Sequence, residues 1–161
     1  MIEEKYKDIA ELSVSIVEAI RRTGLKVVAL RDRYAKFVMP LEGNVNHVGA
    51  MYAGSLFTLG EFTGGIVPGV SFDITRYFPI VKEIKIKYIA MAKTDIHIEA
   101  ELSQEEVKRI EAEADENGKA DITMDLELKN TNNEVVAIVN GVWQIRKLSE
   151  DMKNIFKIPG T

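Results

Sequence analysis

The 161-residue sequence contains no cysteine and only two histidines, His47 and His97. The absence of cysteine excludes disulfide bonds, a thiolate nucleophile and a cysteine-ligated zinc site. Two histidines are too few for a histidine-rich metal site, so neither a metal nor another cofactor is expected. Acidic residues outnumber basic ones, which gives a formal net charge of −4. A nucleic-acid-binding surface is normally basic, so nucleic acid is not an expected partner.

Charge is missing from one long stretch of the chain. Between His47 and Asp73 the only charged side chain is Glu61. The length and apolar character of this stretch suggest a membrane-spanning helix as one alternative. Six glycines, a proline and the central carboxylate argue against it, and favour a helix surrounded by protein. The N-terminal residues MIEEKYKDIA are charged and acidic, unlike a secretory signal, so a cytoplasmic location is expected.

Glu61 is the first candidate for a catalytic residue. Desolvating a lone carboxylate in an apolar segment costs several kcal/mol unless a partner compensates for it. Burial also raises the pKa of a glutamate toward neutrality, where the group can accept and release protons. A structural carboxylate that is satisfied by backbone N–H groups or a lysine remains an open alternative.

Hydrophobic periodicity predicts the elements of the first half of the chain. Apolar residues at spacings of three and four, from Ile9 through Leu12 and Ile16 to Ile20, predict a helix over about residues 3–22. Residues 25–41 alternate as two strands joined near residues 31–33, and residues 41–49 form a loop. Residues 52–65 predict a helix that is apolar on nearly all sides and therefore buried.

The second half predicts four strands and one helix. Residues 80–92 alternate with Ile84, Ile86 and Tyr88 inward, and residues 96–102 are predicted to form a return strand after a turn. Ser103 and Glu106 form a capping-box pattern that opens a helix ending near Asn117. Residues 120–130 and 134–148 predict a hairpin. Residues 149–161 are expected to form a weakly ordered tail or short helix, and the whole chain, 1–161, is expected to be one α+β domain.

Helical spacing indicates which residues share the face of Glu61. On a helix, Gly54 and Thr58 share its face, and Gly65 continues that face. Gly54 lies in the first turn, where backbone N–H groups have no partner within the helix. An acyl carbonyl could accept a hydrogen bond there, which would form an oxyanion hole without a dedicated side chain. Asn46 and His47 lie just upstream, in a loop that could fold over this site.

The string NHVGAMYAGSLFTLGEF, residues 46–62, resembles the signature of hotdog-fold thioesterases of the phenylacetyl-CoA thioesterase-like family. The resemblance covers about residues 25–147. It implies a hotdog fold, in which a long antiparallel sheet wraps around a central buried helix, here with an extra N-terminal helix. It also implies that Glu61 acts as general base or nucleophile. Asn46 would place the water or the thioester, and the backbone N–H of Gly54 would polarise the thioester carbonyl.

The sequence departs from that signature at two places. Tyr52 stands where the family has histidine, and Ala53 replaces the neighbouring glycine. A polar residue that the partner subunit often supplies falls near residues 81–83, with Val81 at the expected position. The residues expected to contact substrate are His47, Tyr52, Ala53 and Thr58.

The resemblance implies a homodimer, or a dimer of dimers, that hydrolyses acyl-CoA or another acyl thioester at a site between subunits. Two alternatives remain open: a hotdog hydratase or dehydratase acting on acyl chains, and a non-catalytic dimer that binds acyl-CoA or lipid. Several residues also have simpler interpretations. Asn46 could be a turn former, His47 an exposed loop residue and Tyr52 a helix cap. His97 is expected at the surface of a strand, and Trp143 in the core.

Overall fold

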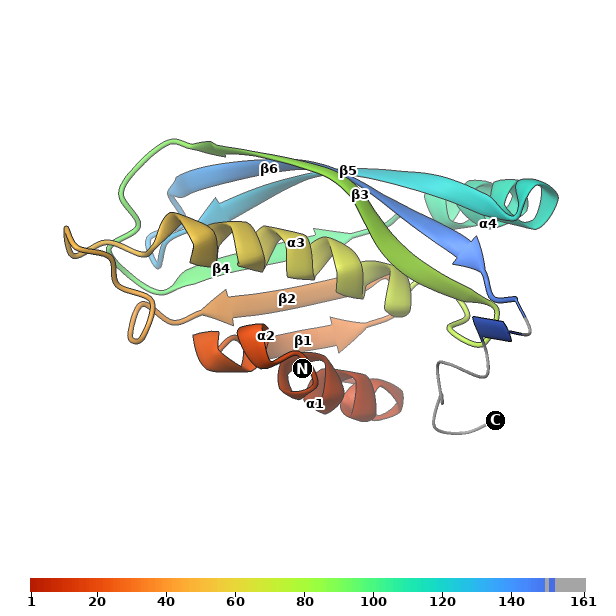
Figure 1. Ribbon diagram of the computed structural model, residues 1–161, viewed down its shortest axis with the longest axis horizontal. Helices are drawn as coiled ribbons and strands as arrows, with labels where there is room; N and C mark the ends of the chain where they lie inside the picture. Colours follow the sequence, from red (N-terminus) through yellow and green to blue (C-terminus); the bar gives the residue numbers. More distant parts are fainter. Residues whose placement is uncertain (150, 153–161) are drawn as a thin grey trace.

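The computed structural model describes residues 1–149, 151 and 152. Six antiparallel strands form one sheet in the order β1-β2-β4-β5-β6-β3, and the sheet curves around the long helix α3 (Figure 1). The strands are β1 (Lys26–Arg31), β2 (Tyr34–Met39), β3 (Tyr77–Tyr88), β4 (Ile96–Glu101), β5 (Lys119–Lys129) and β6 (Val135–Lys147). The wrapped-helix architecture predicted from the sequence is confirmed.

Strand alternation determines which face of the sheet meets α3. In β5 every second residue is buried, including Ile122, Leu126 and Leu128, while the residues between them are charged or polar and exposed. β5 and β6 pair as the predicted hairpin, and β6 places Trp143 in the core with no exposed surface. This period of two is what a sheet with one buried face requires.

Helix α3 (Ala53–Gly69) lies against the sheet through glycines. A methyl group on Gly60 would come within 2.5 Å of the Val139 side chain, and one on Gly64 within 2.0 Å of the Trp143 ring. These two residues therefore allow an approach that a larger residue would block. On the β2 side, Phe37 and Phe62 pack edge to face with ring centroids 5.0 Å apart. The helix extends beyond the predicted residue 65, and Pro68 lies in its last turn.

The N-terminal segment differs from the single helix predicted over residues 3–22. It forms a 3₁₀ turn, η1 (Glu4–Tyr6), then α1 (Lys7–Ser15) and α2 (Glu18–Thr23), and Val17 between the two helices has extended backbone angles. Ser13 and Ser15 donate hydrogen bonds to carbonyls of the preceding turn, which weakens a helix at this point.

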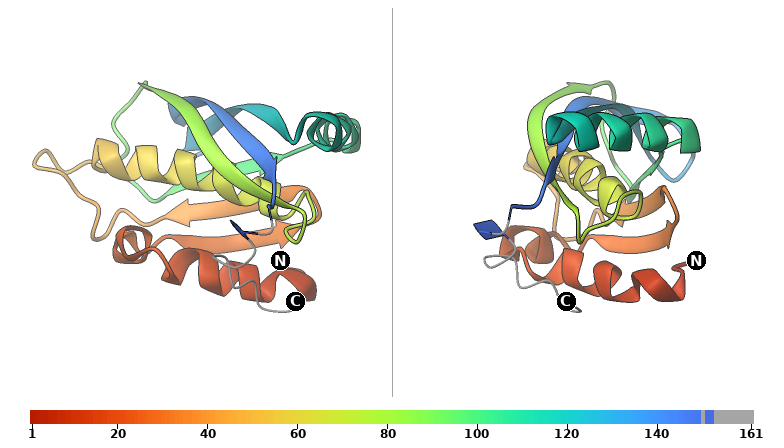
Figure 2. Two further views of the ribbon diagram at one scale, coloured as in Figure 1. Left: turned by 45° about the vertical axis from the view of Figure 1, so that its right-hand side comes forward. Right: turned by 90° about the vertical axis from the view of Figure 1, so that its right-hand side faces the viewer.

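The predicted apolar face is confirmed only at its two ends, because Ile20 is buried and Ile9 packs against the core. Leu12 and Ile16 are 41% and 70% exposed, whereas Ala10 is buried and Val14 packs against the core. Figure 2 shows these short helices lying along β1, away from α3. Ile2 bridges to Leu30, so the N-terminal segment covers the outer edge of β1.

The observed strand pairing contradicts one further prediction, that residues 96–102 return alongside the strand that precedes them. β4 does not pair with β3, and instead lies between β2 and β5, while β3 pairs with β6. Within the described residues, β3 is an edge strand whose one strand neighbour is β6. Helix α4 (Gln104–Asn117) begins with the predicted Ser103–Glu106 capping box and buries Ile110 and Ala114. No helix in the described part of the chain is long and apolar enough to cross a membrane.

Candidate active site

The carboxylate of Glu61 is half-buried in the middle of α3. It forms no ion pair or hydrogen bond with any described residue, and burial raises its pKa above the usual value. A structural role satisfied by a lysine or by backbone N–H groups is therefore absent from the described part of this protomer. An unpaired carboxylate with a raised pKa is suited to accept a proton from water.

The face of α3 that carries Glu61 is its open face. Gly54, Thr58, Glu61 and Gly65 are all half-buried, whereas residues on the sheet side, such as Leu59 and Thr63, are buried. A methyl group on Gly65, one turn further along this face, would meet no atom within 4 Å, so the space beside Gly65 is open. The Thr58 hydroxyl donates to the Gly54 carbonyl at 2.8 Å, so its hydrogen is already used by the helix.

The start of α3 carries two unused backbone donors. The N-cap residue is Tyr52, whose side chain makes no capping hydrogen bond, and its carbonyl accepts from Ser55 and Leu56. The N–H groups of Ala53 and Gly54 have no acceptor among the described residues. Such groups at a helix N-terminus attract an anion or a polarised carbonyl oxygen.

Asn44 fixes the position of this helix end. Its amide nitrogen donates to the carbonyls of Thr23 and Pro40 at 2.7 and 2.9 Å, and its side-chain oxygen accepts from Ser55 at 2.8 Å. The carbonyl of Asn44 also accepts the N–H of Tyr52 at 2.7 Å. Because Asn44 is buried, this network ties the helix start to the end of α2 and to Pro40, the residue that follows β2.

Asn46 stabilises its own loop. Its side-chain oxygen accepts the N–H groups of Val48 and Ala50 at 3.0 and 3.1 Å, which is the arrangement of a turn-forming asparagine. The side-chain amide nitrogen donates to no described residue and remains able to bind a ligand. Asn46 is therefore a turn former whose side-chain N–H groups are still free to donate.

A cavity of about 380 Å³ lies beside the start of α3. It is lined by Asn46 and Ala53 among the predicted residues, and by Tyr88 of β3 with apolar neighbours. Gly54, Thr58 and Glu61 do not line this cavity but continue along the helix from it. His47 is exposed and does not line the cavity either.

The Tyr52 ring lies over Gly54. A methyl group on Gly54 would come within 2.3 Å of the ring, although Tyr52 is 60% exposed. The ring is therefore held on the protein surface by contact with a glycine, with open solvent on its other side. This position lies next to the free N–H groups, where the family signature has histidine.

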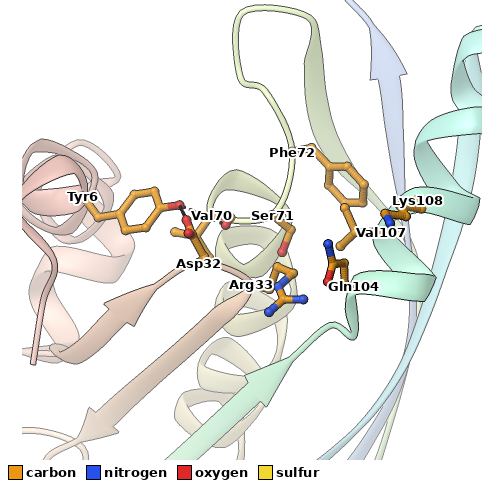
Figure 3. Close-up of a pocket in the computed structure, with 9 residues that line it drawn as sticks. All are labelled: Tyr6, Asp32, Arg33, Val70, Ser71, Phe72, Gln104, Val107 and Lys108. Carbon is orange, nitrogen blue, oxygen red and sulfur yellow. Dashed lines mark hydrogen bonds between the residues drawn. The ribbon is translucent and has the colours of Figure 1, made fainter.

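A larger cavity of about 490 Å³ lies at the other end of α3 (Figure 3). Arg33, in the β1–β2 turn, points toward Gln104 of α4, while Lys108 lies further along α4. The single carboxylate in its lining, Asp32, accepts a hydrogen bond from Tyr6 and pairs with Lys5. This cavity therefore has no free carboxylate that could activate water.

Two residues that shape the site were not among the predicted site residues. Asn44 was predicted as one of several turn formers in its loop. Tyr88 was predicted to point inward from an alternating strand, but it is 47% exposed and lines the cavity instead. Both act through contacts with residues distant in sequence, so no local pattern marks them. Among the described residues, no group of three or more histidine and acidic side chains is placed to hold a metal ion.

Known structures resemble this chain over most of its length. A Pseudomonas aeruginosa protein of unknown function, named a probable thioesterase, is 40% identical and superimposes with a TM-score of 0.83, covering 86% of this chain and 93% of that one. A Chlorobaculum tepidum protein of unknown function is 19% identical, with a TM-score of 0.76 and coverage of 89% and 95%. A Haemophilus influenzae thioesterase is 11% identical, with a TM-score of 0.69 and coverage of 89% and 92%.

The sequence has no significant match among curated proteins. A family model described as a domain of unknown function, DUF4442, matches residues 16–145. The resemblance to hotdog-fold thioesterases is confirmed by the architecture and by the structural relatives. The chain therefore belongs to the DUF4442 family and has the hotdog fold of the thioesterase superfamily.

Proposed function

We propose that this protein is a thioester hydrolase that acts on acyl-CoA or another acyl thioester. One observation carries the proposal: an unpaired, half-buried carboxylate lies on the same open helix face as a helix N-terminus with free N–H groups. The first feature can activate water, and the second can stabilise the oxyanion that the attack creates. The 40% identical relative, named a probable thioesterase, supports the same chemistry.

In the proposed reaction, water attacks the thioester carbonyl carbon while the Glu61 carboxylate takes a proton from it. The carbonyl oxygen becomes an oxyanion that accepts hydrogen bonds from the N–H groups at Ala53 and Gly54. The carbon–sulfur bond then breaks, and the thiolate leaves with the proton from Glu61. The products are a carboxylic acid and a thiol, and the amide nitrogen of Asn46 orients the reactants.

The spacing within α3 supports a site shared between two copies of the chain. Glu61 lies seven residues after Gly54, which is about 10 Å along a helix axis. A carbonyl bound at Gly54 is therefore well beyond one hydrogen bond from Glu61 of the same helix. We propose that a second copy supplies the missing half, so that Glu61 of one protomer faces the α3 N-terminus of its partner.

The edge strand β3 is the proposed contact between the two copies. Among the described strands its one neighbour is β6, and the edge of a sheet readily pairs with a strand of another chain. Large apolar side chains on and just after it are exposed, namely Val81, Tyr88, Ile89 and Met91. Tyr52 and His47 are both exposed, and we propose that they contact the acyl group or its carrier.

Glu61→Gln tests the proposal. Thiol release from a panel of acyl-CoA thioesters should fall about 100-fold or more, as expected for loss of a general base. Glu105→Gln is the matched control, because Glu105 is exposed on α4 and should leave the rate unchanged. Equal rates for wild type and Glu61→Gln would refute the catalytic role of Glu61, and tight acyl-CoA binding without turnover would favour a binding protein.

A further inference from the structure

Tyr88 connects the edge strand to the first turn of α3. Its hydroxyl donates a hydrogen bond to the Ala53 carbonyl oxygen at 3.0 Å, across 35 residues of sequence. Tyr88 and Ala53 both line the 380 Å³ cavity together with Asn46. Within the described chain, this is the one side-chain hydrogen bond to the backbone of Ala53 or Gly54 that comes from outside the helix.

The accepting carbonyl belongs to the peptide group whose N–H is that of Gly54. Every peptide bond described here is trans, so the Ala53 C=O and the Gly54 N–H lie at opposite sides of one planar, conjugated unit. A hydrogen bond to the oxygen withdraws electron density through this unit and makes the N–H a stronger donor. The same contact also fixes the plane of the peptide, and therefore the direction of its N–H.

The Tyr88 hydroxyl remains protonated over the neutral pH range. Burial raises its pKa above the ordinary value, and the neighbouring Tyr52 adds to the shift. A protonated phenol can donate to a carbonyl, whereas a phenolate cannot. The polarising contact is therefore present under the conditions in which a glutamate base is ionised.

We propose that Tyr88 is a positioning residue for the oxyanion site: its hydroxyl orients and polarises the Ala53–Gly54 peptide group that receives the thioester carbonyl. This inference rests on the proposed thioester hydrolysis. Tyr88 touches neither the reacting carbon nor the water and acts through the backbone. The Tyr52 ring covers Gly54 nearby, so both aromatic residues shape the same peptide group.

Tyr88→Phe keeps the ring and removes the hydroxyl. If the contact strengthens one oxyanion hydrogen bond by about 10–30%, kcat for thiol release should fall about two- to eightfold. KM should stay nearly constant, because the bond strengthens as negative charge develops on the oxygen. Tyr34→Phe is the control, since the Tyr34 hydroxyl bonds to the exposed Glu99 on the sheet and its loss should leave kcat unchanged.

A second measurement does not depend on turnover. In protein labelled with ¹⁵N-glycine, the amide proton of Gly54 should move upfield in Tyr88→Phe, whereas glycines far from the helix start, such as Gly118, should not move. An active wild type with an unchanged kcat or an unchanged Gly54 resonance in Tyr88→Phe would overturn the role of Tyr88 alone. A wild type without turnover would instead overturn the proposed function, and the Gly54 shift would still report the contact.

Discussion

Helix α4 begins with a complete capping box, whereas α3 begins with Tyr52, whose side chain caps nothing. In α4, Ser103 accepts from the N–H of Glu106, and the Glu106 carboxylate accepts from the N–H of Ser103. In α3, the N–H groups of Ala53 and Gly54 have no acceptor among the described residues. An isolated helix would be weakened by this omission.

The difference shows how each helix is held in place. α4 is amphipathic, packs against β5 and gains stability from its own cap and its side chains Ile110 and Ala114. α3 is held by packing on the sheet and by Asn44, so its first turn is stable without a side-chain cap. Free donors at a rigidly held helix end are suited to a ligand.

Supplying the missing cap should produce the largest effect. Tyr52 has non-helical backbone angles (φ −59°, ψ 135°), and Asn at this position could accept the N–H of Gly54. Compared with Tyr52→Ala, Tyr52→Asn should be more stable by about 1 kcal/mol but slower in thiol release by about 10²–10³-fold, as for loss of one oxyanion donor. Thermal unfolding and steady-state assays measure both. Equal rates for the two variants would contradict an oxyanion role of Gly54.

A methyl group on Gly64 tests whether packing holds α3. Gly64→Ala places that group 2.0 Å from the Trp143 ring, and overpacking should destabilise the protein by about 1–3 kcal/mol. Gly65→Ala is the matched control, because its methyl group meets open space and should stabilise the helix by about 0.5–1 kcal/mol. Urea unfolding compares the two, and equal stabilities would show that α3 is not fixed by contact with β6.

Removing the cap of α4 should have a smaller effect. Ser103→Ala leaves the N–H of Glu106 without its acceptor, which should lower the free energy of unfolding by about 1 kcal/mol. Thiol release should be unchanged, because α4 lies at the far end of the sheet from the start of α3 (Figure 1). A large loss of activity at unchanged stability would mean that the two helix ends are coupled.

The smallest expected effect is the dependence of stability on pH at Glu61. Because burial raises its pKa in the folded state, ionised Glu61 destabilises the fold. Wild-type stability relative to Glu61→Gln should therefore fall as pH rises from the ordinary glutamate value of 4.5 through the raised value, and then level off. Below pH 4.5 the two proteins should be equally stable. Urea unfolding across this range measures the difference, and a constant offset would contradict the raised pKa.

Much of the fold could be predicted because its signals are local. The capping box at Ser103, the alternation of β5 and β6 and the uncharged stretch around Glu61 each involve residues within one element. The N-terminal helix was predicted less well, because the apolar spacing of Leu12 and Ile16 suggested a buried face that packing does not use. The pairing of β4 with β2 could not be predicted, since strand neighbours depend on distant segments.

The sequence by itself determined that this chain has a buried, almost uncharged helix with Gly54, Thr58 and Glu61 on one face, because helical periodicity fixes which residues share a face. Only the tertiary structure decided that this face is open, that the helix start keeps free N–H groups, and that Asn44 and Tyr88 hold it. These properties depend on which distant groups fill or leave empty the space around a residue, and no local pattern encodes that.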